Sequence, residues 1–431
     1  MIRRRLSFVH VLITLAVASV FTTTSSAHGS AARCNPRTYG AKGDGVTKDT
    51  AAIQKAIDVC EGRGGGTVRL IAGIYLSAPI VLKSKITLWL DKSATLLGSS
   101  DHGDYPPKTE FREPGLQALV SATNASNVAI RGEGVIDGAG ETWWWIMVPE
   151  HVGSKARMST ADPRPRLVVF DHCKHVLVEG ITIQNSPDWQ LVPYYSDDVT
   201  IRNVKILAPA HSANTDAIDP FSSSNVRIDH VLADVGDDDI AIKSGMPGSS
   251  GPDEPSRDIT ITDCTFLHGH GLSIGSELAG GARNIRAERI HFEGTYSGIR
   301  VKSNRDRGND VGPLIFRDID MKNVNNALII SEYYPNVLPR DGEATQPVTR
   351  LTPHFHDIRL ENVTAIGGRF AGAIVGLPEA HITGMVLHDV RINGQHGMTI
   401  GYADLSGTGV VIEAVDGQPI TKLVGAKVSL R

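Results

Sequence analysis

The pattern of apolar positions changes once along the chain. Four apolar residues recur at the spacing of one helical face: Ile53, Ala56, Ile57 and Cys60. Asp49 precedes them as a candidate N-cap, and the pattern ends near Gly62. From Thr67 onward this period is lost, and short runs of β-forming residues separated by turns replace it. The sequence therefore predicts one helix followed by many short strands.

These short strands repeat. Two β-forming residues flank one other residue, and a second such pair follows about five residues later. The motif begins at Val176, Val199, Val226, Ile259, Ile285 and Leu314. These starts are 23, 27, 33, 26 and 29 residues apart. Such a period predicts an all-β solenoid, a single-stranded parallel β-helix capped by the N-terminal helix. A β-propeller, whose period is nearer about 40 residues, is the second interpretation.

Polar residues stand at a fixed distance before four of the predicted strands. The first strand residues are Ile218, Ile240, Leu272 and Ile299. Aligning them places Asp216, Asp238 and His270 at the same offset, two residues upstream. Because stacked coils place equal offsets side by side, we expect these side chains to form one column, which Asp237 joins.

This column has the residue types that acid–base hydrolysis requires. Glycoside hydrolysis uses one protonated carboxylic acid and one ionised carboxylate, and like charges on neighbouring coils raise one pKa. Arg300 and Lys302 lie two residues apart on the fourth strand, so they share a face and are candidates to bind a substrate carboxylate. We expect the chemistry to need no cofactor and no metal.

The first residues have the layout of a secretory signal. Three arginines precede an apolar run from Phe8 to Phe21, and a small-residue site ends at Ala27. We interpret residues 1–27 as a cleaved signal peptide and residues 28–431 as one catalytic β-helix domain, secreted or periplasmic. The apolar run is too short for a convincing membrane span, and no later stretch approaches about 20 apolar residues.

The net charge and the cysteine spacing argue against two classes of ligand, nucleic acids and zinc. Without residues 1–27 the chain has 40 basic and 47 acidic residues, which argues against a general nucleic-acid binder. The four cysteines lack CxxC spacing, so a zinc site is not indicated. Export permits disulfides, and Cys34 with Cys60 is one expected pair, whereas Cys173 and Cys264 are expected to be buried thiols. We expect a monomer with an acidic polysaccharide or oligosaccharide as its partner.

The column residues also carry a family resemblance. Four motifs occur in order: Asn214-Thr215-Asp216, Gly236-Asp237-Asp238, Gly269-His270-Gly271 and Arg300-Val301-Lys302. The chain resembles glycoside hydrolase family 28, the polygalacturonases, from about Tyr39 to roughly Val363. The resemblance implies a right-handed parallel β-helix that hydrolyses α-1,4-linked galacturonate in pectin with inversion.

The resemblance also implies roles. Asp238 resembles the general acid, Asp216 and Asp237 the pair that positions and deprotonates water, and His270 the histidine that supports the acid. Substrate-binding residues are implied at Asn214, Arg300, Lys302 and Tyr333, with Tyr334 as the rival of Tyr333.

Three positions depart from the family pattern, Ala217, Asp239 and Val301. Asp239 adds an acid near the site, and we interpret Asp219 and Asp239 as turn-forming residues. Trp189 has the offset of Asp216 one coil earlier, so it either lines the substrate groove or packs. Trp143, Trp144 and Trp145 either stack on sugar or pack in a loop.

Other functions remain open. A rhamnogalacturonan or xylogalacturonan hydrolase is the nearest alternative, although the Asn-Thr-Asp motif and Arg300 favour a galacturonan. A calcium-dependent pectate lyase and a non-catalytic carbohydrate-binding solenoid are less favoured. Longer loops at 100–121, 150–166, 246–258 and 334–353 are expected to wall a groove, and the sequence does not decide between endo and exo action.

Overall fold

The computed structural model describes residues 32–144, 163–245, 253–340 and 343–431. Within them, residues 32–431 form one compact unit built of short strands that pair in parallel. The expected signal peptide, Trp145, and the loop residues 150–162, 246–252 and 341–342 lie outside the described residues. Among the residues described, no helix has the length and hydropathy that a membrane crossing requires.

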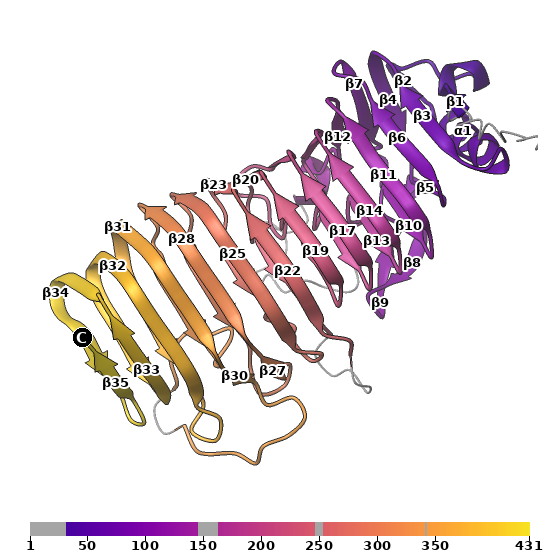
Figure 1. Cartoon of the computed structure of the whole chain (residues 1–431). Coiled ribbons are helices and arrows are strands. Elements are labelled where there is room, and N and C mark those ends of the chain that lie inside the picture. Colours follow the sequence, from indigo (N-terminus) through magenta and orange to yellow (C-terminus); the bar gives the residue numbers. More distant parts are fainter. Residues whose placement is uncertain (1–31, 145–162, 246–252, 341–342) are drawn as a thin grey trace, which may run out of the picture. The chain divides into compact units, whose positions relative to one another are not determined.

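The parallel β-helix predicted from the period is confirmed. Each coil contributes strands to parallel rows that run along the stack from β1 and α1 to β35 (Figure 1). One row contains β1 (Ala32–Cys34), β3 (Gly66–Leu70), β6 (Ile86–Leu90), β11 (Ser126–Gly132), β14 (Lys174–Glu179), β17 (Asp197–Arg202), β19 (Ser224–Asp229), β22 (Ser256–Thr262), β25 (Ala282–Glu293), β28 (Leu314–Lys322), β31 (Ile358–Val375), β32 (Ile382–Gly401), β33 (Ala403–Thr408) and β35 (Lys427–Leu430).

A second row lies beside the first. It contains β2 (Asp44–Lys48), β4 (Gly73–Ser77), β7 (Ala94–Gly98), β12 (Val135–Asp137), β15 (Thr182–Gln184), β18 (Lys205–Leu207), β20 (Leu232–Asp234) and β23 (Thr265–Phe266). The distal halves of the long strands β25, β28 and β31 continue this row.

The third row carries the predicted motifs, and we call it the motif sheet. It contains β5 (Ile80–Leu82), β10 (Val120–Thr123), β13 (Val168–Asp171), β16 (Leu191–Tyr194), β21 (Ile240–Ile242), β24 (Leu272–Ile274), β26 (Ser297–Lys302) and β29 (Asn326–Ser331), followed by parts of β31, β32 and β34 (Val411–Lys422). Outside the three rows stands the antiparallel hairpin β8 (Pro107–Glu110) and β9 (Glu113–Leu116). The short parallel pair β27 (Asp310–Val311) and β30 (His354–Phe355) adjoins the first row, because Val311 pairs with Ala282 of β25.

The register explains why the apolar period appears in the sequence. The six repeat starts from Val176 to Leu314 are successive partners in the first row. All six side chains are buried, and each buried aliphatic side chain stabilises the stack by about 1.5–3 kcal/mol. The residue before each of the first five starts has a positive φ, a conformation that Asn and Asp tolerate better than most residues: His175, Asp198, Asn225, Asp258 and Asn284. The corner before Leu314 instead holds Pro313, which follows Gly312 at φ 149°.

The N-terminal helix α1 (Thr50–Gly62) buries the four apolar residues that predicted it and contacts β1, β3, β5 and β6. A disulfide between Cys34 and Cys60 joins it to β1, which confirms the expected pair. Asp49 occupies the N-cap position, but the prediction that it caps the helix is wrong, because its carboxylate accepts hydrogen bonds from the backbone of Lys42 and Gly43. The described residues also contain three shorter helices, η1 (Pro36–Tyr39), η2 (His102–Asp104) and α2 (Glu141–Trp144).

Candidate active site

The column predicted from the motifs corresponds to one continuous register. Leu191, Ile218, Ile240, Leu272, Ile299 and Leu328 are successive partners across the motif sheet. Asp216, Asp238 and His270 each precede their register residue by two positions, so they occupy equivalent places on neighbouring coils. The coil from Asp238 to His270 is ten residues longer than the coil before it. The strand pairing is nevertheless kept, because Ile240 still pairs with Leu272.

Strand alternation selects the side chains that face outward from this sheet. The register residues Ile240 and Ile299 are fully buried in the core. Lys243 and Lys302 stand three positions after these residues, so both project from the opposite face. Arg300 stands one position after Ile299 and shares that face. The sheet therefore presents three cations beside the column of acids.

Asp238 lies between two of these cations. Its carboxylate accepts hydrogen bonds from Lys302 Nζ at 2.7 Å, Ser273 Oγ at 2.7 Å and Arg300 Nη1 at 3.4 Å. Burial raises the pKa of this carboxyl, but Lys302 and Arg300 outweigh burial and hold the pKa well below its usual range. Without substrate, Asp238 is therefore ionised.

Asp216 has a different environment. Its Oδ2 lies 3.3 Å from Lys243 Nζ, and the same ammonium group lies 3.4 Å from Asp219 and 3.8 Å from Glu277. Burial and the neighbouring charges of Asp219 and Asp237 raise the pKa of Asp216. Burial also raises the pKa of Asp219, to about 7. One lysine thus serves three carboxyl groups, and the Asp216–Asp219 pair retains a proton near neutral pH.

His270 contacts a different aspartate from the one expected. Its Nδ1 lies 2.9 Å from Asp237 Oδ1, whereas the sequence analysis paired it with Asp238. Burial raises the pKa of Asp237, but the hydrogen bond with His270 and the charges of His270 and Lys302 together outweigh burial and lower the pKa. One ligand atom from each of Asp237, Asp238 and His270 lies within 4.8 Å of the others. The second and third motifs therefore meet in space.

Asn214 and the two candidate tyrosines are the remaining residues that the family resemblance implied for substrate binding. The side-chain oxygen of Asn214 accepts a hydrogen bond from Arg164 at 2.8 Å. Tyr333 is buried against Ala373, Val375 and Leu377. The ring of Tyr334 instead lies over Lys302, with Nζ 5.5 Å from its centroid. The structure thus places the rival tyrosine, and not Tyr333, beside the cations of the site.

Trp189 lies beside the site but is largely buried. Lys243 Nζ lies 4.7 Å from its ring centroid, and Arg166 lies between Trp189 and Phe111, 4.6 and 4.3 Å from their centroids. Phe111 is at the tip of the β8–β9 hairpin, so the segment expected at 100–121 does reach the motif sheet. Trp189 packs under this hairpin and holds Lys243 from one side.

Trp143 and Trp144 pack against neighbouring side chains. Trp143 stacks on His102 with centroids 3.5 Å apart, and the indole nitrogen of Trp144 donates to the backbone oxygen of Ser186 at 2.9 Å. Cys173 and Cys264 are buried free thiols, as expected. Packing is the role that the structure supports for these four side chains.

Two aspartates interpreted as turn formers have other roles. Asp219 is fully buried and pairs with Lys243. Asp239 is also fully buried, and its Oδ2 accepts a hydrogen bond from the Gly271 backbone at 3.0 Å. Burial raises the pKa of Asp239, and its second oxygen has no hydrogen-bond partner among the described residues. Asp239 therefore supports the loop that carries His270.

Lys243, Glu277 and Arg164 were not predicted from the sequence as part of the site, and Asp219 was interpreted only as a turn-forming residue. A signal for Lys243 was present, since it stands three residues after Ile240 as Lys302 stands three after Ile299. Asp219 likewise stands one residue after Ile218, the offset of Arg300. Glu277 and Arg164 come from irregular segments, where no strand period exists to place them.

The chain is similar to known protein families and to individual relatives. A family model described as glycosyl hydrolases family 28 matches residues 72–406, and a rhamnogalacturonase A/epimerase, pectate lyase-like model matches residues 34–97. A probable polygalacturonase of Vitis vinifera is 30% identical over 379 residues, which cover 82% of this chain and 73% of that protein. An endo-polygalacturonase of Pectobacterium carotovorum is 30% identical over 332 residues, covering 73% and 77%.

Solved structures agree with the sequence comparison. The crystal structure of an exopolygalacturonase from Thermotoga maritima matches with a TM-score of 0.72 and 28% identity, over 93% of this chain and 91% of that one. The polygalacturonase of Erwinia carotovora matches with a TM-score of 0.66 and 26% identity, over 90% and 94%. With the four ordered motifs and this fold, the chain belongs to glycoside hydrolase family 28.

Proposed function

We infer that this enzyme hydrolyses α-1,4-galacturonosidic bonds of polygalacturonan or its oligosaccharides by acid–base catalysis with inversion. The observation that carries the inference is the environment of Asp238, a buried carboxylate that lies within hydrogen-bond distance of two cations from β26. Arg300 and Lys302 are then available to a substrate carboxylate, which a neutral sugar lacks.

The same ion pairs suggest how Asp238 becomes an acid. A galacturonate carboxylate that binds Arg300 and Lys302 adds a negative charge beside Asp238 and competes for both cations. The interactions that lower the pKa of Asp238 are then weakened, while burial, which raises it, remains. Substrate binding would thus protonate Asp238 where the glycosidic oxygen needs a proton.

The other half of the site supplies the base. Asp237, whose pKa is lowered, is an ionised acceptor that can orient a water molecule. Asp216 has a raised pKa, so its ionised form is the stronger base and takes the proton from that water. Inversion needs the acid and base about 6.5–9.5 Å apart, which leaves room for water between them.

Replacing Asp238 by Asn tests the assignment. Reducing-sugar release from polygalacturonate should fall by about 10²–10⁴ or more, because the proton donor is lost while the shape is kept. Asp258→Asn, at a half-buried coil corner outside the motifs, is the matched control. NMR of the first product should show the inverted anomer. Unchanged release in Asp238→Asn would support a binding solenoid, whereas a calcium-dependent, ultraviolet-absorbing product would indicate a lyase.

Binding calorimetry tests the proposed protonation. Asp216→Asn binds oligogalacturonate without rapid turnover, and in two buffers of different ionisation enthalpy it should take up a proton on binding. The double variant Asp216→Asn/Asp238→Asn should take up none. Uptake that is equal in both proteins would assign the proton to another group.

The apolar N-terminal run and the pectic substrate together support export. We propose that the enzyme acts outside the cytoplasm, either secreted or in the periplasm.

A further inference from the structure

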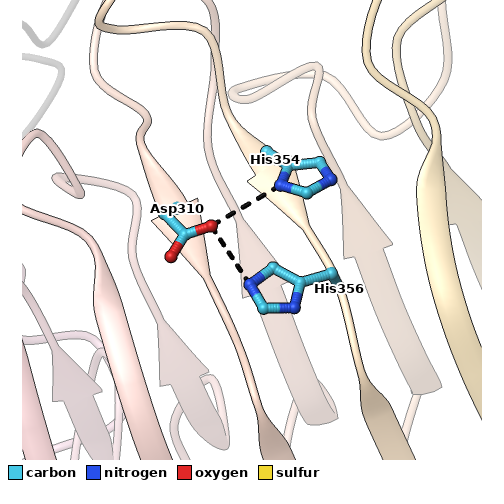
Figure 2. A group of neighbouring side chains, drawn as sticks. All are labelled: Asp310, His354 and His356. Atoms are coloured by element: carbon cyan, nitrogen blue, oxygen red, sulfur yellow. Dashed lines mark ion pairs between the residues drawn. The ribbon is translucent and has the colours of Figure 1, made fainter.

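A cluster of two histidines and one aspartate lies outside the catalytic column. His354 and His356 flank Phe355 at the end of the 334–353 segment, and Asp310 stands on β27 of the preceding coil. The parallel register pairs Asp310 with His354 and Val311 with Phe355. Since side chains alternate along a strand, the buried Phe355 and Val311 face the core, and the three polar side chains share the outer face. Figure 2 shows both imidazoles turned toward one carboxylate oxygen.

The distances within this cluster suit a tetrahedral metal ion. His356 Nε2 lies 3.1 Å and His354 Nδ1 3.5 Å from the same Asp310 oxygen. All three ligand atoms lie within 4.8 Å of one another. Zinc binds nitrogen and oxygen at about 2.0–2.1 Å, so neighbouring ligand atoms in a tetrahedral site are about 3.3 Å apart. The side chains need little movement to meet such an ion.

A second carboxylate orients one of the ligands. The other ring nitrogen of His356, Nδ1, lies 2.9 Å from Asp357 Oδ2. A carboxylate at Nδ1 holds the proton on that nitrogen and leaves Nε2 with its lone pair toward the metal, which is the usual arrangement around metal-bound histidine. Arg283 Nε lies 3.4 Å from the second oxygen of Asp310, so it orients that carboxylate and leaves the first oxygen to the ion.

Two imidazoles beside one carboxylate distinguish this cluster from the other described histidines that contact a carboxylate. His175 contacts Asp198 and His268 contacts Asp234, each through a single carboxylate. The cluster at Asp229, His230 and Asp263 has only one imidazole. Among the residues described, the Asp310 cluster is the one in which two imidazoles meet a carboxylate within that distance.

We propose that Asp310, His354 and His356 bind a divalent transition-metal ion, with Zn²⁺ as the best match and Asp357 as the orienting residue. Two imidazoles and one carboxylate are ligands that Zn²⁺ accepts, and the exposed position leaves a fourth site for water. The ion would join β30 to β27, and so fix the end of the segment that begins at Tyr334, near Lys302. Its role is structural, because none of its ligands belongs to the catalytic column.

Metal binding by the tag-free enzyme tests this site. After treatment with a chelator and removal of that chelator, zinc titrated in competition with a chromophoric zinc indicator should bind at about one ion per chain. His356→Ala and Asp310→Asn should abolish this binding. Asp357→Asn should weaken it by about 10–100-fold, because the ligand loses its orienting partner. His175→Ala, also at an exposed histidine beside an aspartate, should bind zinc as the parent does.

A thermal melt separates the site from a structural ion pair. Zinc should raise the Tm of the parent and of His175→Ala, but not that of His356→Ala. Turnover of polygalacturonate by each variant checks that the fold is intact. Equal zinc binding by the parent and His356→Ala, or none by either, would overturn the proposal.

Discussion

Asp216 and Asp238 occupy equivalent positions on neighbouring coils, but their protonation is controlled in opposite directions. Both side chains are buried, which by itself raises the pKa of either. Asp238 contacts Lys302 and Arg300, and no other described carboxylate contacts those two cations. Asp216 shares Lys243 with two further acids. The pKa of Asp238 is therefore lowered and that of Asp216 raised.

The comparison shows that the ratio of cations to acids, and not the depth of burial, sets the charge state here. A repeating fold supplies equal positions on every coil. The outward-facing residues of each strand then set the pKa of an aspartate at that position. In this site the ratio differs because Lys302 and Arg300 stand on one strand, whereas Lys243 stands among three acids.

The largest expected effect comes from Lys243→Met. Removing one partner of a buried charge cluster costs about 3–5 kcal/mol, so the free energy of unfolding should fall by that amount at about pH 8. Folded pKa values above the unfolded ones favour the protonated form, so the cost should shrink as pH falls below the Asp219 pKa of about 7. Urea denaturation at about pH 8 and about pH 4.5 measures this.

The matched control is Lys205→Met, at an exposed strand position of the same stack. Its unfolding free energy should change little at either pH. An equal loss at both pH values in Lys243→Met would mean that the lysine acts through packing, and the charge-ratio interpretation would then be wrong.

A smaller effect is expected from Lys302→Met. A hydrogen bond to a charged group contributes about 1.5–3 kcal/mol, so kcat/KM on polygalacturonate should fall about 10–100-fold. The pKa of Asp238 should rise because its nearest cation is lost. The profile of kcat/KM against pH would show this shift. Lys322→Met, an exposed lysine paired with Glu293, is the control; an unchanged profile in Lys302→Met would argue against control of Asp238 by this cation.

The smallest effect is expected from Asp239→Asn. Its raised folded pKa favours folding below the unfolded pKa of about 3.9, and that contribution is lost as pH rises through the folded value. Asn keeps an acceptor for the Gly271 backbone and cannot ionise, so it should stabilise the protein by about 1 kcal/mol at about pH 8. At about pH 3 it should be nearly neutral, and thermal melts at both pH values decide. A stability loss at about pH 8 would show that the ionised form of Asp239 is needed.

The sequence predicts the repeating part of the site well, because the strand period carries the information. Ile218, Ile240, Leu272 and Ile299 were aligned by their offsets, and the same residues are partners in the structure. The alternation of side chains along a strand also predicts that Lys243 faces outward, because Lys243 follows Ile240 by three residues as Lys302 follows Ile299. The buried face of α1 was predictable from helical spacing, which places Cys60 on that face. The expected pairing of Cys60 with Cys34 rested instead on export, which permits disulfides.

Outside the strands, the period does not predict the direction of a side chain. β29 ends at Ser331, so alternation does not say whether Tyr333 or Tyr334 turns toward Lys302. Local sequence also does not show that His270 contacts Asp237, because both lie in turns. The histidines at 354 and 356 share a face by period, but Asp310 is brought to them by the register of a pair only two residues long.

The uneven spacing of the column has a consequence for how such enzymes diversify. The steps from Asp216 to Asp238 and from Asp238 to His270 contain 22 and 32 residues, yet each spans one coil. The entropic cost of closing a loop rises only slowly with the length of that loop. Insertions and deletions between coils are therefore inexpensive mutations that leave the reacting groups in place. Natural selection can reshape the walls around a substrate while the inherited catalytic residues stay unchanged.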